Sequence, residues 1–284
     1  MPPDAVIFDV DGVLVDVRGS FLDAVKRAVQ RTVVAETRAL DDAPLVDDSV
    51  IATFKRAGGF NNDWDLAHAL ALWYLETAGD ARTTSEIRER AGEVAAAARV
   101  SLDARAARVP RPTHGEMRSL MLELYWGSAE AERLFGVKPR LDVREPLLAS
   151  ERVLLRPETV IALRLVGVRR FGVLTGRLRV EYEAIRHRLP LPADAPALTD
   201  EDGRKPDPMF LRRLVDRLEA KRPCYVGDVM DDWGLVAAYN ARFPSAPAVG
   251  VLVASDGADE RAFRAAGATL ILRDVNDLPE LLAR

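Results

Sequence analysis

Two acidic residues near the start of the chain, Asp9 and Asp11, have the type and spacing to do chemistry. They follow a short apolar run at residues 6–8, typical of a buried strand, and Gly12 comes directly after them. Residues two apart on a strand point the same way, so both carboxylates should face one spot at its carboxyl end, where open α/β sheets bind ligands. Adjacent carboxylates repel each other unless a cation or a proton compensates. The spacing indicates a cation or acid–base site; the alternative is a strand that runs into an acidic turn.

Three later segments end in residues suited to hold a phosphate or a cation. Thr175 and Gly176 close an apolar run with a hydroxyl and a glycine whose backbone can approach a ligand closely. Lys205 stands just before a helix that begins with proline, and Asp228 and Asp232 follow another apolar run. Taken singly, these are an ordinary turn, a solvated loop and a helix cap. Together they supply complementary groups in one order, which is hard to attribute to chance.

The elements that must position these groups alternate along the second half of the chain. Helices are predicted at 157–166, 178–188, 208–219 and 232–240, strands at 169–175, 197–198, 223–227 and 247–253, and a final helix and strand within 259–273. Such alternation predicts an α/β fold, a Rossmann-like parallel sheet with right-handed crossovers. The segment between the first strand and this alternation is helical in pattern and has no strands of its own. We therefore predict a core formed by 1–16 and 150–284 and an inserted α-helical domain of 17–149.

Bulk composition limits the classes of partner. The 284 residues carry 40 basic and 44 acidic side chains, a formal net charge of −4, which gives no electrostatic case for binding nucleic acid or an anionic membrane. No apolar run reaches membrane-spanning length and no secretory signal is seen, so we expect a cytoplasmic protein. The Ala/Arg-rich stretch at 81–109 is predicted to be a solvent-exposed helix and a candidate contact in a homodimer.

The four segments resemble the four motifs of the haloacid dehalogenase-like (HAD) hydrolase superfamily. These are Asp-x-Asp-Gly-x-Leu-x-Asp, a threonine at a strand end, Lys-Pro, and Gly-Asp-x-x-x-Asp. The resemblance covers about 1–16 and 150–284. The helical insertion is similar in position to the α-helical cap of the phosphoglycolate phosphatase and β-phosphoglucomutase branch.

The resemblance implies a role for each motif residue in phosphoryl transfer. Asp9 would be the nucleophile that forms a phosphoaspartate. Asp11 would protonate the leaving oxygen and then activate water. Thr175, the Gly176 amide and Lys205 would hold the oxygens of the transferring phosphoryl group.

The resemblance also implies a Mg²⁺ site. The Asp9 carboxylate, the Asp11 backbone carbonyl and Asp228 would hold the ion, which suits hard oxygen donors and cancels the repulsion between a carboxylate and a phosphate dianion. Asp232 would be an outer-sphere partner of the ion, with Asp231 as a less favoured stand-in.

Substrate selection is predicted to involve a polar segment of the insertion at 53–64. Lys55, Arg56, Asn61 and Asn62 are candidate substrate contacts there, and the alternative is an ordinary helix connection. Arg177 follows the predicted phosphate-binding turn and is a further candidate.

The predicted activity is Mg²⁺-dependent hydrolysis of a small phosphorylated metabolite, a phosphomonoester. Dehalogenases of the superfamily lack the second aspartate, so the presence of Asp11 favours phosphoryl transfer. Two alternatives stay open: a phosphomutase of the β-phosphoglucomutase type, and a non-catalytic binding protein on the same scaffold.

Overall fold

The computed structural model describes residues 2–57, 60, 62–254 and 256–283. The chain divides into two compact units, one formed by Met1–Asp16 with Arg152–Arg284 and the other by Val17–Glu151. We call them the sheet unit and the helical unit. The division predicted from the sequence, after residues 16 and 149, places the second boundary two residues earlier.

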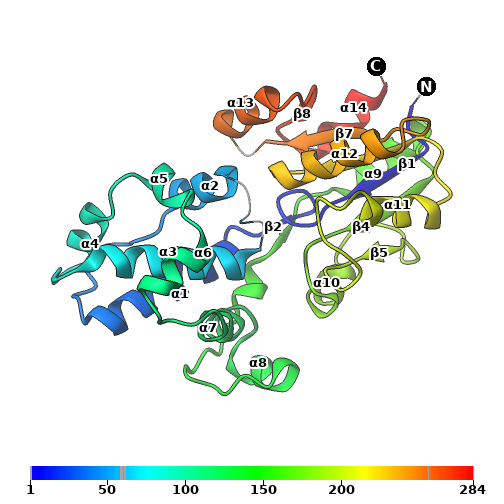
Figure 1. Ribbon diagram of the computed structural model, residues 1–284. Coiled ribbons are helices and arrows are strands. Elements are labelled where there is room, and N and C mark those ends of the chain that lie inside the picture. Colours follow the sequence, from blue (N-terminus) through cyan, green and yellow to red (C-terminus); the bar gives the residue numbers. More distant parts are fainter. Residues whose placement is uncertain (1, 58–59, 61, 255, 284) are drawn as a thin grey trace. The chain divides into compact units, whose positions relative to one another are not determined.

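A six-stranded sheet organises the sheet unit, with the blue N-terminal strand among strands from the second half of the chain (Figure 1). Its strands are β1 (Ala5–Phe8), β4 (Arg170–Leu174), β5 (Ala197–Leu198), β6 (Pro223–Gly227), β7 (Val249–Val253) and β8 (Leu270–Leu272). The order is β5-β4-β1-β6-β7-β8, and all neighbours run parallel. Asp9, Thr175 and Asp228 each follow directly after one of the three adjacent strands β1, β4 and β6. The predicted α/β class with a parallel sheet is confirmed.

Helices cover this sheet because its central strand is apolar throughout. All four residues of β1 are buried, as expected for a strand covered on both faces. Ala5 and Ile7 pack in one cluster with apolar side chains of two helices, α11 (Pro208–Arg217) and α12 (Met230–Arg242). The other helices of the unit are α9 (Pro157–Leu165), α10 (Arg179–Arg186), α13 (Gly257–Ala265), the 3-10 turn η2 (Val275–Asp277) and α14 (Leu278–Ala283).

A short antiparallel ribbon, which the sequence pattern did not predict, lies where the chain passes between the units. It pairs β2 (Val15–Asp16) with β3 (Arg152–Val153). Each of these two strands consists of one apolar and one charged residue, so neither is itself an apolar run that could be recognised from sequence. Both connections to the helical unit therefore leave from one hydrogen-bonded ribbon.

The apolar stripe of the first helix lies in the core of the helical unit. Val25, Ala28 and Val29, which recur at helical spacing, are all buried in its core. Among its described residues the unit contains no strand, only one isolated bridge between Leu40 and Thr83. The helices are α1 (Phe21–Thr37), α2 (Asp48–Ala57), α3 (Asp63–Ala78), α4 (Thr84–Arg90), α5 (Val94–Ala98), α6 (Leu102–Arg108), α7 (His114–Trp126), α8 (Ser128–Phe135) and the 3-10 turn η1 (Leu147–Ser150).

The prediction of one solvent-exposed helix at 81–109 is wrong. The stretch forms three short helices, α4 to α6, because Gly92 turns the chain at a φ of +72° and the Ser101 side chain caps α6. Arg105 is buried rather than solvated and contacts the Glu76 carboxylate at 2.6 Å. Across the part of the chain that the structure describes, no helix combines the length and the apolar character needed to cross a membrane.

Candidate active site

The carboxylate of Asp9 lies buried at the carboxyl end of β1. Its backbone amide donates to the Val226 carbonyl at 2.8 Å, which fixes the residue against the neighbouring strand β6. Oδ1 accepts a hydrogen bond from the Val10 amide at 2.7 Å, and Oδ2 lies 2.7 Å from Lys205 Nζ. Burial raises the pKa of Asp9 to about 7; Lys205 opposes this shift, and the carboxylates of Asp232 and Asp11 add to it.

Lys205 is held between two carboxylates. Its ammonium is 2.7 Å from Asp9 Oδ2 and 2.7 Å from Asp232 Oδ1, and its side chain is 2% exposed. It also lies 5.8 Å from the ring centroid of Tyr225. Burial alone would lower the pKa of Lys205, but the two carboxylates raise it above its usual value. The lysine is therefore a fixed positive charge next to Asp9.

Asp232, in the first turn of α12, is completely buried and accepts four donors. Oδ1 receives the Tyr225 hydroxyl at 2.6 Å together with the Lys205 ammonium. Oδ2 receives the amides of Asp228 and Val229 at 2.9 and 3.0 Å. Although burial opposes it, this set of donors, Lys205 foremost, lowers the pKa of Asp232. A carboxylate has about four lone-pair positions, so its acceptor capacity is filled by protein donors.

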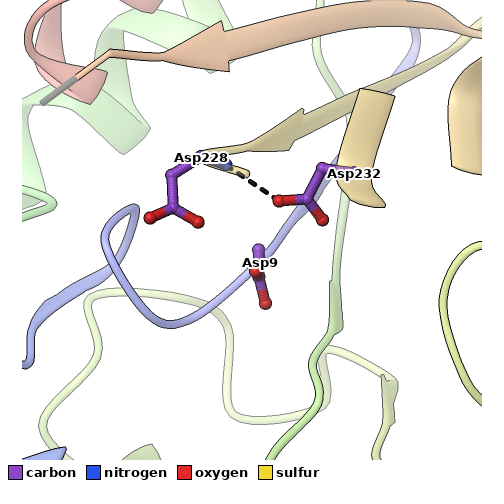
Figure 2. Close-up of side chains that lie close together, drawn as sticks. All are labelled: Asp9, Asp228 and Asp232. Atoms are coloured by element: carbon purple, nitrogen blue, oxygen red, sulfur yellow. Dashed lines mark hydrogen bonds between the residues drawn. The ribbon is translucent and has the colours of Figure 1, made fainter. Parts of the chain in front are cut away.

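Three carboxylates form the one cluster with metal-binding spacing among the described residues. Asp9, Asp228 and Asp232 each offer an oxygen, and these oxygens lie within 4.8 Å of one another (Figure 2). Because Asp232 is already satisfied, Asp9 and Asp228 are the carboxylates suited to direct ligation. A Cβ on Gly12 would overlap the Asp228 carboxylate, so the turn after Asp11 approaches Asp228 as closely as glycine allows.

The donor set fits a hard divalent cation. Counted as charged, four carboxylates and two cationic side chains meet among the described residues and leave an excess of two negative charges. The carboxylates are those of Asp9, Asp11, Asp228 and Asp232, and the cations are Arg177 and Lys205. Carboxylate and carbonyl oxygens are the ligands that Mg²⁺ prefers. A cation would also offset the burial that raises the Asp9 pKa. The residues present therefore fit the ion that the sequence motifs imply.

Thr175 and Gly176 lie beside this cluster, at the end of β4. Thr175 is buried, and its hydroxyl oxygen accepts the Arg177 amide at 3.1 Å. A Cβ placed on Gly176 would meet nothing within 4 Å, so the turn faces open space. Backbone amides and a hydroxyl at such a turn can hold the oxygens of an anion.

Arg177 contacts Asp11 directly, which the sequence did not indicate. Its Nε and Nη2 lie 2.8 and 2.6 Å from the same oxygen, Asp11 Oδ1. The arginine side chain is 1% exposed, whereas that of Asp11 is 34% exposed. The sheet unit therefore brings its sequence-predicted residues together. The residue of α12 that contacts Lys205 is Asp232, and not its stand-in Asp231.

The candidate substrate residues of the insertion belong to the helical unit and have local partners there. Lys55 pairs with Asp63 at 3.1 Å, and the Arg56 guanidinium lies 3.5 Å from the Thr53 hydroxyl. The Asn62 side chain caps α3 by accepting the Trp64 amide at 2.9 Å. Asn61 lies outside the described residues. A role for these side chains in substrate binding stays a prediction.

Sequence reasoning missed Tyr225 as a member of the site. Its hydroxyl donates to Asp232, which itself holds Lys205. A tyrosine in a buried strand looks like an ordinary core residue. The one signal in the sequence is the alternation of side chains along a strand, which puts Tyr225 on the same face of β6 as Gly227, the face toward α12.

Comparisons with known proteins agree with this architecture. The family model described as "Hydrolase: haloacid dehalogenase-like hydrolase" matches residues 3–234. No curated protein matches the chain. Among solved structures, phosphatase Tt82 from Thermococcus thioreducens is 24% identical, with 98% of each chain covered and a TM-score of 0.67. A proposed phosphoglycolate phosphatase from Lactobacillus delbrueckii subsp. bulgaricus is 16% identical, with 99% of each chain covered and a TM-score of 0.58. At these identities the likeness concerns the fold.

Proposed function

This chain belongs to the haloacid dehalogenase-like hydrolase family, and we propose that it is a Mg²⁺-dependent phosphatase that hydrolyses a small-molecule phosphomonoester through a phosphoaspartate at Asp9. One observation carries the proposal. The buried Asp9 carboxylate has the Lys205 ammonium on one oxygen and lies in a cluster with Asp228 and Asp232. A carboxylate nucleophile needs both a nearby positive charge and a site for a cation before it can approach a phosphate dianion.

The first half of the reaction transfers the phosphoryl group to Asp9. A carboxylate oxygen of Asp9 attacks phosphorus, the bond to the leaving oxygen breaks, and Asp11 gives its proton to that oxygen. Lys205, the Thr175 hydroxyl and the Gly176 amide balance the negative charge on the phosphoryl oxygens. The product of this half is an alcohol and a phosphoaspartate.

The second half hydrolyses the phosphoaspartate. Asp11, now ionised, takes a proton from a water whose oxygen attacks phosphorus. The bond between phosphorus and Asp9 breaks, its electron pair returns to the carboxylate, and inorganic phosphate leaves. Asp11 is protonated again, so the cycle is closed.

The cation would be held by the carboxylates of Asp9 and Asp228 and by the backbone carbonyl of Asp11. When bound, Mg²⁺ supplies charge neutralisation for the phosphoryl group and keeps the nucleophile ionised. The raised pKa of Asp9 supports this assignment, because a cation favours the ionised carboxylate that burial disfavours.

The burial of Asp9 supports a terminal phosphate on a small molecule as substrate. Only an unhindered phosphoryl group can bring its phosphorus to a side chain this deeply buried. The formal net charge of −4 gives no basic footprint for a polymeric phosphate backbone.

The test is phosphate release from a panel of alkyl and aryl phosphate esters, with and without Mg²⁺. We expect turnover that requires Mg²⁺ and is abolished in Asp9→Asn and Asp9→Ala. Asp216→Asn is the matched control, because Asp216 is an exposed carboxylate on α11 that pairs with Arg212. Full activity of either Asp9 variant, or conversion of a sugar phosphate to its isomer without free phosphate, would contradict the proposal.

A further inference from the structure

The ion pair between Arg177 and Asp11 has a hydrogen-bond geometry that charge neutralisation alone does not require. Both Nε and Nη2 of the arginine donate to one oxygen, Oδ1. Among the described residues, no donor contacts the other oxygen, Oδ2, of Asp11. The guanidinium therefore holds one oxygen of a carboxylate whose side chain is 34% exposed.

The arginine is itself fixed before it reaches Asp11. Its amide donates to the Thr175 hydroxyl oxygen at 3.1 Å, and its carbonyl accepts the Asp200 amide at 3.0 Å. Its side chain is 1% exposed, against 34% for that of Asp11. A buried guanidinium, carried by a hydrogen-bonded stretch of backbone, thus contacts a partly exposed carboxylate.

A buried arginine needs a counter-ion wherever it occurs, so the ordinary explanation is that Asp11 only neutralises Arg177. That explanation does not account for the contact to a single oxygen, since a guanidinium facing a carboxylate frequently binds both oxygens in parallel. It also does not account for the choice of Asp11, the residue whose free oxygen must reach the leaving group.

We propose that Arg177 is a positioning residue that holds Asp11 by Oδ1, so that Oδ2 is presented to the leaving oxygen of the substrate. The inference rests on the proposed phosphatase function. Arg177 touches no reacting atom in this role and acts only through Asp11. Its effect should therefore grow with the substrate's need for a proton on the leaving group.

The test is the leaving-group dependence of Arg177→Met. Values of kcat/KM report the steps up to departure of the leaving group, so later hydrolysis of the phosphoaspartate does not obscure them. We expect kcat/KM for the best alkyl phosphate of the panel to fall about 10²-fold, the size of effect that misplacing a catalytic group produces. For 4-nitrophenyl phosphate, whose leaving group hardly needs a proton, we expect a loss of about threefold or less.

Three comparisons make the result specific. Arg177→Met combined with Asp11→Asn should lose no more alkyl phosphatase activity than Asp11→Asn alone, because both act on one proton transfer. Added methylguanidinium should restore part of the activity of Arg177→Ala. Arg179→Met is the matched control, because Arg179 is half-exposed, pairs with Asp202 and should keep wild-type selectivity.

Equal losses on both esters, or additive losses with Asp11→Asn, would overturn the inference, as would an Arg177→Met variant of wild-type activity. If Arg177→Met does not fold, Arg177→Lys can replace it, because lysine keeps the charge but lacks the paired N–H donors of the guanidinium. This variant should also lose more activity on the alkyl phosphate than on 4-nitrophenyl phosphate, with a smaller difference between the two. A crystal structure of either variant tests the inference even if the wild type hydrolyses neither ester. The Asp11 side chain should leave its wild-type rotamer, and an unchanged rotamer contradicts positioning.

Discussion

The substitution Asp232→Asn separates two roles that the acidic cluster alone does not distinguish: ligation of the cation and fixation of Lys205. An asparagine can keep its amide oxygen on the backbone amides of Asp228 and Val229, so the turn after β6 should survive. Its NH₂ group would then face the Lys205 ammonium and the Tyr225 hydroxyl. What the variant removes is the buried ion pair.

The magnitude follows from the geometry of that pair. Asp232 and Lys205 are 0% and 2% exposed, with 2.7 Å between their charged atoms. Removing one partner of a buried pair costs about 3–5 kcal/mol. Because Asp9 still lies 2.7 Å from Lys205 Nζ, we expect the lower end, about 3 kcal/mol. Tyr225→Phe removes one hydrogen bond to a charged group and should cost about 1.5–3 kcal/mol.

The assay must report the sheet unit alone, since a chain of two units need not unfold in one step. Hydrogen exchange of the β6 amides under native conditions measures the local free energy of opening. Calorimetric titration with Mg²⁺ then compares Asp232→Asn with Asp228→Asn. We expect the second to lose far more Mg²⁺ affinity than the first, because Asp228 is suited to direct ligation whereas the oxygens of Asp232 are already filled by protein donors. Equal losses of affinity in the two variants, with unchanged exchange in β6, would show that Asp232 is a metal ligand and refute the reasoning.

Three further outcomes follow from single contacts. Gly12→Ala puts a residue with a Cβ into a left-handed conformation, at a cost of about 1–2 kcal/mol, and pushes the Asp228 carboxylate aside. Calorimetric titration should then show a Mg²⁺ affinity lower by roughly tenfold or more. Unchanged affinity would contradict the close approach of Gly12 to Asp228. Asn62→Ala should lower the stability of the helical unit by about 1 kcal/mol, while Asn62→Asp keeps the cap; a raised KM with an intact helix would instead make Asn62 a substrate contact. Burial lowers the pKa of His68, so protonation favours the unfolded chain: the helical unit keeps its full stability above about pH 6.5 and loses it as the pH falls through the lowered folded value. His68→Gln should flatten that slope in tryptophan fluorescence, and a slope unaltered by the substitution would assign it elsewhere.

The sequence by itself was sufficient for the order along the chain of the six sheet strands and the helices between them, and for the motif positions at strand ends. The strand at 223–227 agrees residue for residue with β6, because an apolar run bounded by proline and glycine is a local signal. The same local reasoning failed at 81–109, where the many alanine and arginine residues favour one continuous helix. Gly92 and the cap at Ser101 divide that stretch, and burial of Arg105 is decided by the helices it packs against.

Only the tertiary structure decided how the polar groups are paired. The motifs predicted Asp232 as an outer-sphere partner of the ion, with Asp231 as its stand-in, and did not predict a contact with Lys205. The packing of α12 against β6 put Asp232 in that contact. The contact between Arg177 and Asp11 joins residues 166 positions apart, so no periodicity could reveal it. Hydrophobic patterning is repeated along the chain, so a short stretch of sequence is enough to detect it. An ion pair instead depends on one rotamer at each of two distant positions. Strand order brings those positions together, and sequence spacing alone does not.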